Sequence, residues 1–188
     1  YLNDLNLSQT IKIVGGKTRQ ESTFKALKKI KKFNCKQILI HDAARPNVSY
    51  RLISNVISKL KINDSAIPII KTNDATKRVK KNIIFKNIER NSLRFAQTPQ
   101  GFSFKKIYKK HKENINKSFD DDSALFTNNL EKVFTINGDK SNIKITDKKD
   151  MDIFKLIKKK IVYSGIGFDV HKLTMKRKLY LGGIKIPF

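Results

Sequence analysis

An α/β fold is the class that this sequence predicts, and two observations predict it. Short apolar runs that suit buried strands, at residues 38–40 and 66–70, alternate with longer segments whose apolar residues recur at helical spacing. The first run ends abruptly in His41, Asp42 and then Arg45. Because open α/β sheets bind ligands where their strands end, Asp42 and Arg45 are candidates for binding a metal-bound phosphate, although a surface turn with an ion pair has the same pattern.

The first part of the chain predicts strands and helices in alternation. We expect, in order, a strand at 11–14 that Gly15-Gly16 ends, a helix at 19–32, a strand at 38–40, a helix that Ser49 caps, and a strand at 66–70. This order predicts right-handed crossovers in a mostly parallel sheet.

A change of pattern follows at residues 77–95, where apolar and polar residues alternate. Alternation with period two predicts a β hairpin, and an arm of this kind has little core of its own, so we expect it to pack on a partner. Farther along we expect a loop at 98–101, a helix at 104–113, a short helix started by the acidic run 120–122, strands at 132–136 and 142–146, and a helix capped by Asp147 that runs to about Lys159. We interpret His41 as a structural residue and His111 as solvent-facing.

The helix near Lys159 predicts the end of a domain at residues 1–160. Residues 161–171 and 179–187 suit two further strands, which cannot form a core by themselves. We therefore expect residues 161–188 to be the start of a second domain that the sequence does not complete.

Composition limits the function classes. The 188 residues are 39% hydrophobic, carry a formal net charge of +25 at pH 7, and contain no apolar run long enough to cross a bilayer. The basic residues are spread along the whole chain and are mostly Lys, whereas specific nucleic-acid recognition relies on Arg and interleaved aromatics. We expect no membrane and no specific nucleic acid as partners. A single cysteine, Cys35, is consistent with the cytoplasm.

Several short motifs occur in a fixed order along the chain. They are Gly15-Gly16 with Arg19 and Ser22, His41 to Pro46, Asp74 to Lys77, Arg90 with Thr98-Pro99-Gln100, Asp120 with Ser123, and Asn142 to Thr146. Each motif is weak alone, but together they resemble the methylerythritol phosphate cytidylyltransferases of non-mevalonate isoprenoid synthesis. The resemblance implies a Rossmann-like nucleotidyltransferase fold with a protruding β arm.

The resemblance also implies the reaction and its residues. This family transfers a cytidylyl group from CTP to 2-C-methyl-D-erythritol 4-phosphate with Mg²⁺ and releases pyrophosphate. By resemblance, Gly16 and Ser22 lie beside the cytosine, Asp42 contacts substrate hydroxyls or the metal region, and Arg45 binds the acceptor. Thr98 and the catalytic pair Arg90 and Lys144 complete the acceptor phosphate site, with Arg90 supplied across a dimer, so the protein is expected to be a homo-oligomer.

Two departures from the family pattern stand out. The family's opening glycine-rich loop, which grips the triphosphate, is not in the sequence, so we expect the chain as given to be inactive by itself. The family also tends to carry Thr directly after the acid at Asp74, but here Ala75 holds that position and Thr76 follows.

The end of the chain resembles a second family. Gly165 to His171 followed by Gly182 to Pro187 is similar to the opening of methylerythritol cyclodiphosphate synthase, an α+β enzyme of the same pathway. Residues two apart on a strand point to one side, so Asp169 and His171 can hold one cation, Zn²⁺ or another divalent metal. The family's third ligand, a histidine, would lie beyond Phe188.

The sequence thus predicts a fusion of a cytidylyltransferase with a cyclodiphosphate synthase that releases CMP. One alternative is a cytidylyltransferase for another polyol phosphate, such as ribitol phosphate. The other alternative is a basic nucleic-acid-binding module, whose affinity would fall steeply with salt.

Overall fold

The computed structural model describes residues 10–115, 117–127, 131–157, 178–181 and 184–187. The chain divides into two units, Tyr1–Ile157 and Lys158–Phe188, and each is described by itself. The domain boundary that we expect after residue 160 lies close to this division, and the assignment of the two units as two functional domains stays a prediction.

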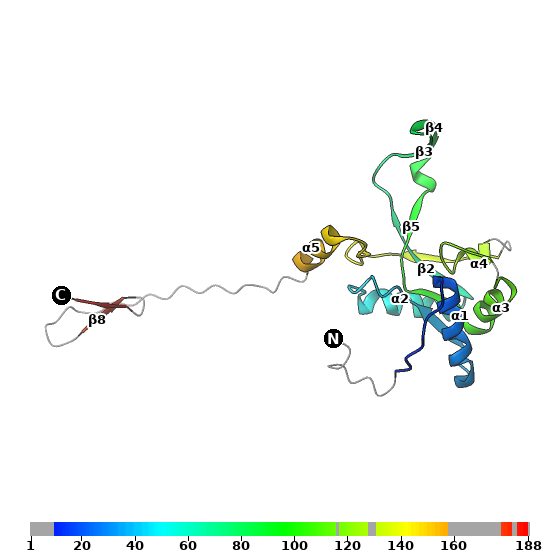
Figure 1. The fold of residues 1–188 in the computed structure, drawn as a ribbon, viewed down its shortest axis with the longest axis horizontal. Helices are drawn as coiled ribbons and strands as arrows, with labels where there is room; N and C mark the ends of the chain where they lie inside the picture. Colours follow the sequence, from blue (N-terminus) through cyan, green and yellow to red (C-terminus); the bar gives the residue numbers. More distant parts are fainter. Residues whose placement is uncertain (1–9, 116, 128–130, 158–177, 182–183, 188) are drawn as a thin grey trace. The chain divides into compact units, whose positions relative to one another are not determined.

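A five-stranded mixed sheet forms the centre of the described part of the larger unit. Its strands are β1 (Gln37–Ile40), β2 (Ser65–Lys71), β5 (Arg94–Ala96), β6 (Gln100–Ser103) and β7 (Thr135–Asn137). β1 and β2 each pair antiparallel with β6, β2 pairs antiparallel with β5, and β2 pairs parallel with β7. β1, β2 and β7 therefore run in the same direction, as expected of an α/β fold, and Figure 1 shows helices around this sheet.

The expected mostly parallel sheet needs correction. Residues 98–101 were expected to form a loop, but Gln100–Ser103 is β6, which lies between β1 and β2 and runs against both. The reason is burial: Gln100 is 1% exposed and Phe102 is fully buried. A strand between two others pairs the backbone N–H and C=O groups along both of its edges, whereas a buried loop would leave many of them unpaired.

The expected strands at the two ends of this unit are also wrong. Residues 11–14 form no strand in the structure, and Val14 is 88% exposed. Residues 142–146 form none either, because their backbone bonds to a loop rather than to a strand: the Ile145 N–H donates to the Ala44 carbonyl at 2.8 Å. The strand expected at 132–136 is the shorter β7.

Two capped helices agree with the sequence. α1 (Arg19–Ile30) begins at Thr18, whose side chain accepts a hydrogen bond from the Glu21 N–H, and the 3₁₀ turn η1 (Lys31–Phe33) follows it. α2 (Tyr50–Leu60) begins at Ser49, whose side chain accepts from the Leu52 N–H. Caps of this kind satisfy backbone donors that the first turn leaves unpaired.

The helices bury their apolar residues in two clusters. Phe24 and Leu27 of α1 pack with Phe102 and with Ile107 of α3 (Phe104–Glu113), while Val56 and Leu60 of α2 form a second cluster with Ala66. The remaining short elements are η2 (Arg90–Ser92), α4 (Ala124–Thr127) and α5 (Lys148–Ile157). Asp147 caps α5 as expected, since its carboxylate accepts from the Asp150 N–H at 2.9 Å. Within the described ranges no helix is long and apolar enough to span a bilayer.

The predicted arm is confirmed as a β hairpin. β3 (Thr76–Lys80) pairs antiparallel with β4 (Ile83–Ile88), and the hairpin extends away from the sheet (Figure 1). Lys81 and Asn82 in the turn have φ of 48° and 64°, as a two-residue hairpin turn of the right twist requires. Large apolar side chains are exposed along the arm, namely Val79, Ile83, Ile84 and Phe85.

In the smaller unit, β8 (Leu179–Leu181) pairs antiparallel with β9 (Ile184–Ile186). The single strand expected at 179–187 is therefore wrong. Glycines weaken a strand, and the sequence places Gly182 and Gly183 between the two. The strand expected at 161–171 lies outside the described residues.

Gly101 of β6 is required by close packing beneath α2. A Cβ at this position would lie 2.5 Å from Val56 Cγ1 and 2.7 Å from Leu60 Cδ1. We expect Gly101→Ala to lower the free energy of unfolding by about 2 kcal/mol, because overpacking forces buried side chains to move. Urea unfolding measures this, and adding Val56→Ala should recover part of the loss; a Gly101→Ala protein as stable as the wild type would contradict the packing.

Candidate functional site

Asp42 lies in a tightly bonded loop at the end of β1. Its N–H donates to Thr98 Oγ1 at 3.0 Å, and its carbonyl accepts from the Arg45 N–H at 2.9 Å. His41 braces the same loop, because its Nδ1 lies 3.0 Å from Thr98 Oγ1 and its Nε2 lies 2.9 Å from the Arg45 carbonyl. This agrees with our interpretation of His41 as structural, and it fixes where the Asp42 carboxylate points.

Three cations surround that carboxylate. Asp42 Oδ1 lies 3.7 Å from Arg19 Nε, and Oδ2 lies 3.4 Å from Lys144 Nζ and 3.8 Å from Arg45 Nε. The Asp42 side chain is 19% exposed, while that of Lys144 is 48% exposed and can move. One carboxylate cannot neutralise three cations, so this cluster, which we call the Asp42 cluster, retains positive charge that suits phosphate groups.

Arg45 is the most firmly held of the three cations. Its Nη1 donates to the Asn142 carbonyl at 2.8 Å and its Nη2 to the Ala96 carbonyl at 3.5 Å. Burial lowers the pKa of the guanidinium, and the charge of Asp42 opposes that effect. The two carbonyls therefore fix the position of the Arg45 charge, whereas the half-exposed Lys144 side chain can move its charge.

A network of side chains ties the loop before α5 to the sheet. The Asn142 side-chain amide donates to the Thr98 carbonyl at 2.8 Å, and the Gln97 amide donates to the Asp139 carbonyl at 2.8 Å. Asn142 is fully buried and Gln97 is 3% exposed. These contacts hold the loop that contains Lys144 next to Asp42. The structure thus brings together predicted site residues from three parts of the sequence: Asp42 with Arg45, Thr98, and Lys144.

Asp139 makes the stability of the protein depend on pH through this loop. Hydrogen bonds from the Ser141 hydroxyl and N–H lower the pKa of its carboxyl. A lowered folded-state pKa stabilises the protein above the unfolded value of about 3.9 and loses that effect as pH falls through the folded value. We expect Asp139→Asn to lower Tm by about 2 °C at pH 7, a small effect because the carboxylate is only partly buried, and by less at pH 3. Thermal scans from pH 7 to 3 test this; an equal deficit at both ends would contradict it.

Gly16 and Ser22 lie together at the start of α1. The Gly16 N–H donates to Ser22 Oγ at 2.8 Å, and that hydroxyl donates to the Thr18 carbonyl at 2.8 Å. A Cβ on Gly16 would lie 2.5 Å from Glu21 Cβ, so this close turn requires glycine. Arg19, in the first turn of the same helix, connects the turn to the Asp42 cluster. The expected position of Gly16 and Ser22 beside a cytosine stays a prediction.

Arg90 is not part of this group. Its Nη1 donates to the Asn73 carbonyl at 3.1 Å, and it lines an open pocket of about 610 Å³ with Lys71, Arg94 and their neighbours. In the described part of the chain Arg90 makes no hydrogen bond or ion pair with the Asp42 cluster. The expected role of Arg90 at the acceptor phosphate site stays a prediction.

Residues that the sequence did not predict complete the surroundings. Arg19 also pairs with Asp122, which is 1% exposed, and Asp122 pairs with His111. The solvent-facing interpretation of His111 is therefore wrong: it is 1% exposed and stacks on Phe24 of α1, with ring centroids 6.0 Å apart. Its spacing from Phe104 and Ile107, at i+7 and i+4, could have placed it on the buried face of α3.

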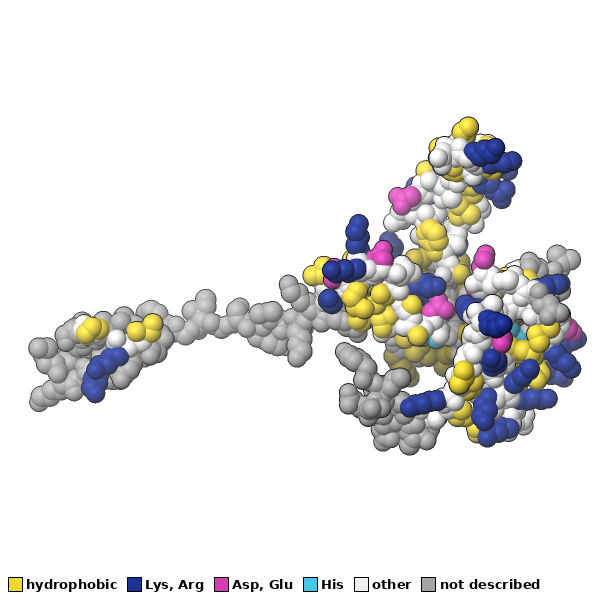
Figure 2. Space-filling view, in the orientation of Figure 1, with side chains coloured by type: hydrophobic (Ala, Val, Ile, Leu, Met, Phe, Trp, Pro, Cys, Tyr) yellow, Lys and Arg dark blue, Asp and Glu magenta, His cyan; other side chains and the backbone are white. Residues whose placement is uncertain are grey.

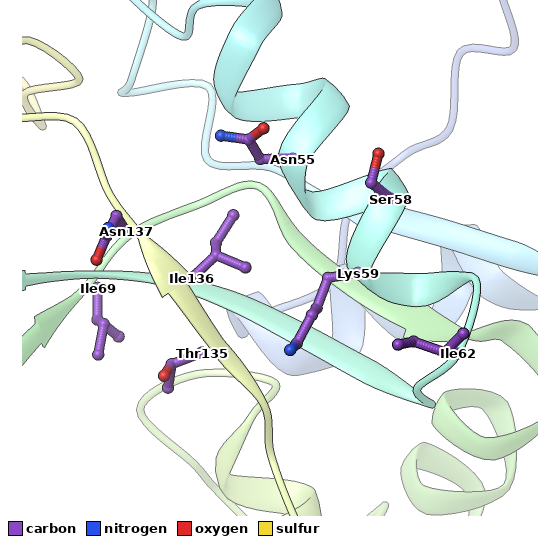
Figure 3. Close-up of a pocket in the computed structure, with 8 residues that line it drawn as sticks. All are labelled: Asn55, Ser58, Lys59, Ile62, Ile69, Thr135, Ile136 and Asn137. Atoms are coloured by element: carbon purple, nitrogen blue, oxygen red, sulfur yellow. The ribbon is translucent and has the colours of Figure 1, made fainter.

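A groove lies elsewhere on this unit, between the end of α2 and the strands β2 and β7 (Figure 3). It has a volume of about 570 Å³. It is lined by Asn55, Ser58, Lys59, Ile62, Ile69, Thr135, Ile136 and Asn137. None of the predicted site residues is among them, and the groove has no carboxylate, so the Asp42 cluster is the better candidate site.

The structure holds no strong metal site within the ranges it describes, since no three His, Cys, Asp or Glu residues there gather at one point. Asp42 is the one carboxylate of the Asp42 cluster. The predicted metal ligands Asp169 and His171 lie outside the described residues.

The fold and site define the class of α/β proteins in which a cluster of cations, of a kind that suits phosphate groups, lies where a central strand ends. Residues 1–160 match the family model "IspD: 2-C-methyl-D-erythritol 4-phosphate cytidylyltransferase". The chain belongs to this family. The predicted resemblance is confirmed.

Relatives and solved structures agree. The chain is 43% identical over 187 residues, all of its length, to "Bifunctional enzyme IspD/IspF" of Pelagibacter ubique, and covers 48% of that protein; for the Bartonella quintana enzyme of the same name the values are 37%, 94% and 48%. The chain thus spans about half the length of these curated relatives. Their names confirm the predicted link to bifunctional enzymes.

The crystal structure of 4-diphosphocytidyl-2C-methyl-D-erythritol synthase from Anaerococcus prevotii superposes with a TM-score of 0.72 at 29% identity, covering 80% of this chain and 70% of that one. Bifunctional IspDF from Campylobacter jejuni gives 0.65 at 29% identity, covering 78% and 38%. The predicted nucleotidyltransferase fold is confirmed.

Proposed function

We propose that the protein containing this chain transfers the cytidylyl group of CTP to 2-C-methyl-D-erythritol 4-phosphate and releases pyrophosphate. The observation that carries the proposal is the Asp42 cluster, in which Arg19, Arg45 and Lys144 surround one carboxylate in a member of this family. An acceptor that carries both hydroxyls and a phosphate matches this combination of one acid and several bases.

In this reaction a phosphate oxygen of the acceptor attacks the α-phosphorus of CTP, and pyrophosphate leaves. Negative charge builds on the oxygens around phosphorus, so alignment and fixed positive charge supply most of the catalysis. Arg45, held by two backbone carbonyls, supplies a fixed charge, and Lys144 can move from Asp42 to the acceptor phosphate. Asp42 would then accept hydrogen bonds from acceptor hydroxyls, while Thr98 holds the Asp42 loop and offers its remaining lone pair.

Gly16 and Ser22 would form the cytosine side of the site. The turn that they build has no side chain at Gly16, so a flat base can approach the backbone closely. The Ser22 hydroxyl already holds this turn, which makes its contribution one of shape.

Arg90 would reach the acceptor phosphate from a second copy of the chain. Two observations support a homo-oligomer: among the described residues of its own chain Arg90 makes no hydrogen bond or ion pair with the Asp42 cluster, and the arm exposes Val79, Ile83, Ile84 and Phe85. Exposed apolar side chains gathered on a hairpin are typical of a surface that a partner covers.

The one carboxylate of the Asp42 cluster suits Mg²⁺ only in part. Mg²⁺ is often held by one or two carboxylates together with substrate phosphates and water, so Asp42 could hold the ion once CTP is bound. When bound, Mg²⁺ would neutralise charge on the phosphates.

We further propose a second activity, the formation of 2-C-methyl-D-erythritol 2,4-cyclodiphosphate with release of CMP. The bifunctional relatives support this activity. Asp169 and His171 would hold Zn²⁺ or another divalent metal.

The test is pyrophosphate release from CTP and Mg²⁺ by the complete reading frame that contains these residues. Release with methylerythritol phosphate and not with ribitol phosphate is the expected result. The reverse preference would assign another polyol phosphate as acceptor and overturn the pathway.

Figure 2 shows Lys and Arg side chains over several parts of the visible face, the arm included, so a DNA-binding titration against salt is a useful addition. Steeply salt-dependent DNA affinity without pyrophosphate release would favour the nucleic-acid alternative. We place the activity in the cytoplasm, where the single free Cys35 would stay reduced.

A further inference from the structure

The buried carboxylate of Asp122 lies behind the candidate site, not in it. Asp122 is 1% exposed and precedes α4. Its Oδ2 accepts a hydrogen bond from Arg19 Nη2 at 2.5 Å, and its Oδ1 lies 3.0 Å from His111 Nε2. A buried charge is tolerated when it is paired and hydrogen-bonded, and here both oxygens have a partner.

Among the residues that the structure describes, the hydrogen-bond partner of the His111 ring is this carboxylate. The ring is buried against Phe24, and its Nδ1 is buried with no hydrogen-bond partner among those residues. An ionised carboxylate only accepts hydrogen bonds, so Nε2 is the donor toward Asp122. Since the ring packs inside the α1 and α3 interface, it prevents the Asp122 carboxylate from turning away from Arg19.

Arg19 connects the buried pair to the site. Its Nη2 contacts Asp122, and its Nε lies 3.7 Å from Asp42 Oδ1, so one guanidinium faces two carboxylates. The Arg19 side chain is 36% exposed, which leaves part of it open to a ligand. An arginine anchored on one side keeps its orientation at little further entropy cost when it binds an anion.

We propose that Asp122, braced by His111, is a positioning residue that holds Arg19 toward the phosphates of CTP. This rests on the proposed function. Arg19 lies in the first turn of α1, next to the turn of Gly16, and so on the nucleotide side of the Asp42 cluster. Without Asp122, the Arg19 guanidinium is free to pair more closely with Asp42. That pairing would lower the affinity of the site for phosphates and would leave the Asp42 carboxylate less able to bind substrate hydroxyls.

The experiment is a double-mutant cycle in the full-length enzyme with Asp122→Asn, Arg19→Ala and the two combined. Asparagine keeps the size of Asp122 and one acceptor oxygen but removes the charge. We expect Asp122→Asn to raise the KM for CTP about tenfold, with a small change in the KM for the acceptor. The double variant should be no worse than Arg19→Ala, because Asp122 acts through Arg19.

Asp121→Asn is the matched control. Asp121 binds Gln100, Ser123 and the Ala124 N–H but not Arg19, so its replacement should lower Tm and leave the KM for CTP unchanged. An unchanged KM for CTP in Asp122→Asn, or losses that add in the double variant, would overturn the proposal.

A second readout separates this proposal from the proposed function. If the wild-type enzyme transfers no cytidylyl group, the proposed function has failed, and binding of inorganic pyrophosphate measured by calorimetry then decides about Asp122. Pyrophosphate affinity at least tenfold weaker in Asp122→Asn than in the wild type supports the positioning role. Equal affinity, or no binding by the wild type, overturns it.

Discussion

Lys144→Ala is expected to lower kcat/KM for the acceptor about a hundredfold or more while the protein stays folded. The Lys144 side chain is 48% exposed, and its ion pair is with Asp42 at 3.4 Å. A half-exposed pair of this kind contributes little to stability. Loss of a cation from a site where negative charge develops costs about two to three orders of magnitude in rate. Steady-state kinetics with the acceptor varied measures the effect, and a thermal scan checks the fold.

Lys148→Ala provides the control for Lys144. Lys148 is the exposed first residue of α5, four positions along the chain, and its replacement removes the same charge. Kinetics of this variant should equal those of the wild type. Unchanged acceptor kinetics in Lys144→Ala, or an equal loss in both variants, would remove Lys144 from the site.

The elements that the sequence predicts well are those whose pattern is local. α1 and α2 each present apolar residues at helical spacing, and Ser49 caps α2 as the sequence predicts. β6 is different, because Pro99 and Gly101 are residue types typical of turns. Gln100 and Gly101 form a strand only because β1 and β2 supply partners on both sides and Val56 and Leu60 pack over Gly101. No local pattern contains that information.

The site residues also divide into those that nearby residues predict and those that they do not. Asp42 and Arg45 follow a predicted strand directly, so their place at a strand end could be inferred from nearby residues. Lys144 and Thr98 entered only through the family resemblance, and the structure brings both to Asp42. The contact between Arg19 and Asp122 joins residues 103 positions apart, and a sequence read without relatives holds no signal for it.

Mixing two inactive variants, Arg90→Ala and Lys144→Ala, is expected to restore activity if the arm completes the site of a second copy. Within one chain, Arg90 binds the Asn73 carbonyl and Lys144 binds Asp42, while the arm that precedes Arg90 exposes apolar side chains. In a mixed dimer, one site would contain both replacements and the other would contain neither.

Random mixing makes half of the dimers mixed, each with one of two sites intact, so the mixture should recover about a quarter of wild-type activity. The subunits are exchanged by co-expression, and pyrophosphate release is measured. The control is a mixture of Lys144→Ala with Arg45→Ala, two residues that meet at Asp42 within one chain and so cannot complement if Arg90 alone crosses between copies. Mixed Arg90→Ala and Lys144→Ala dimers without activity would place Arg90 outside the site, and recovery in both mixtures would place the boundary between subunits through the Asp42 cluster itself.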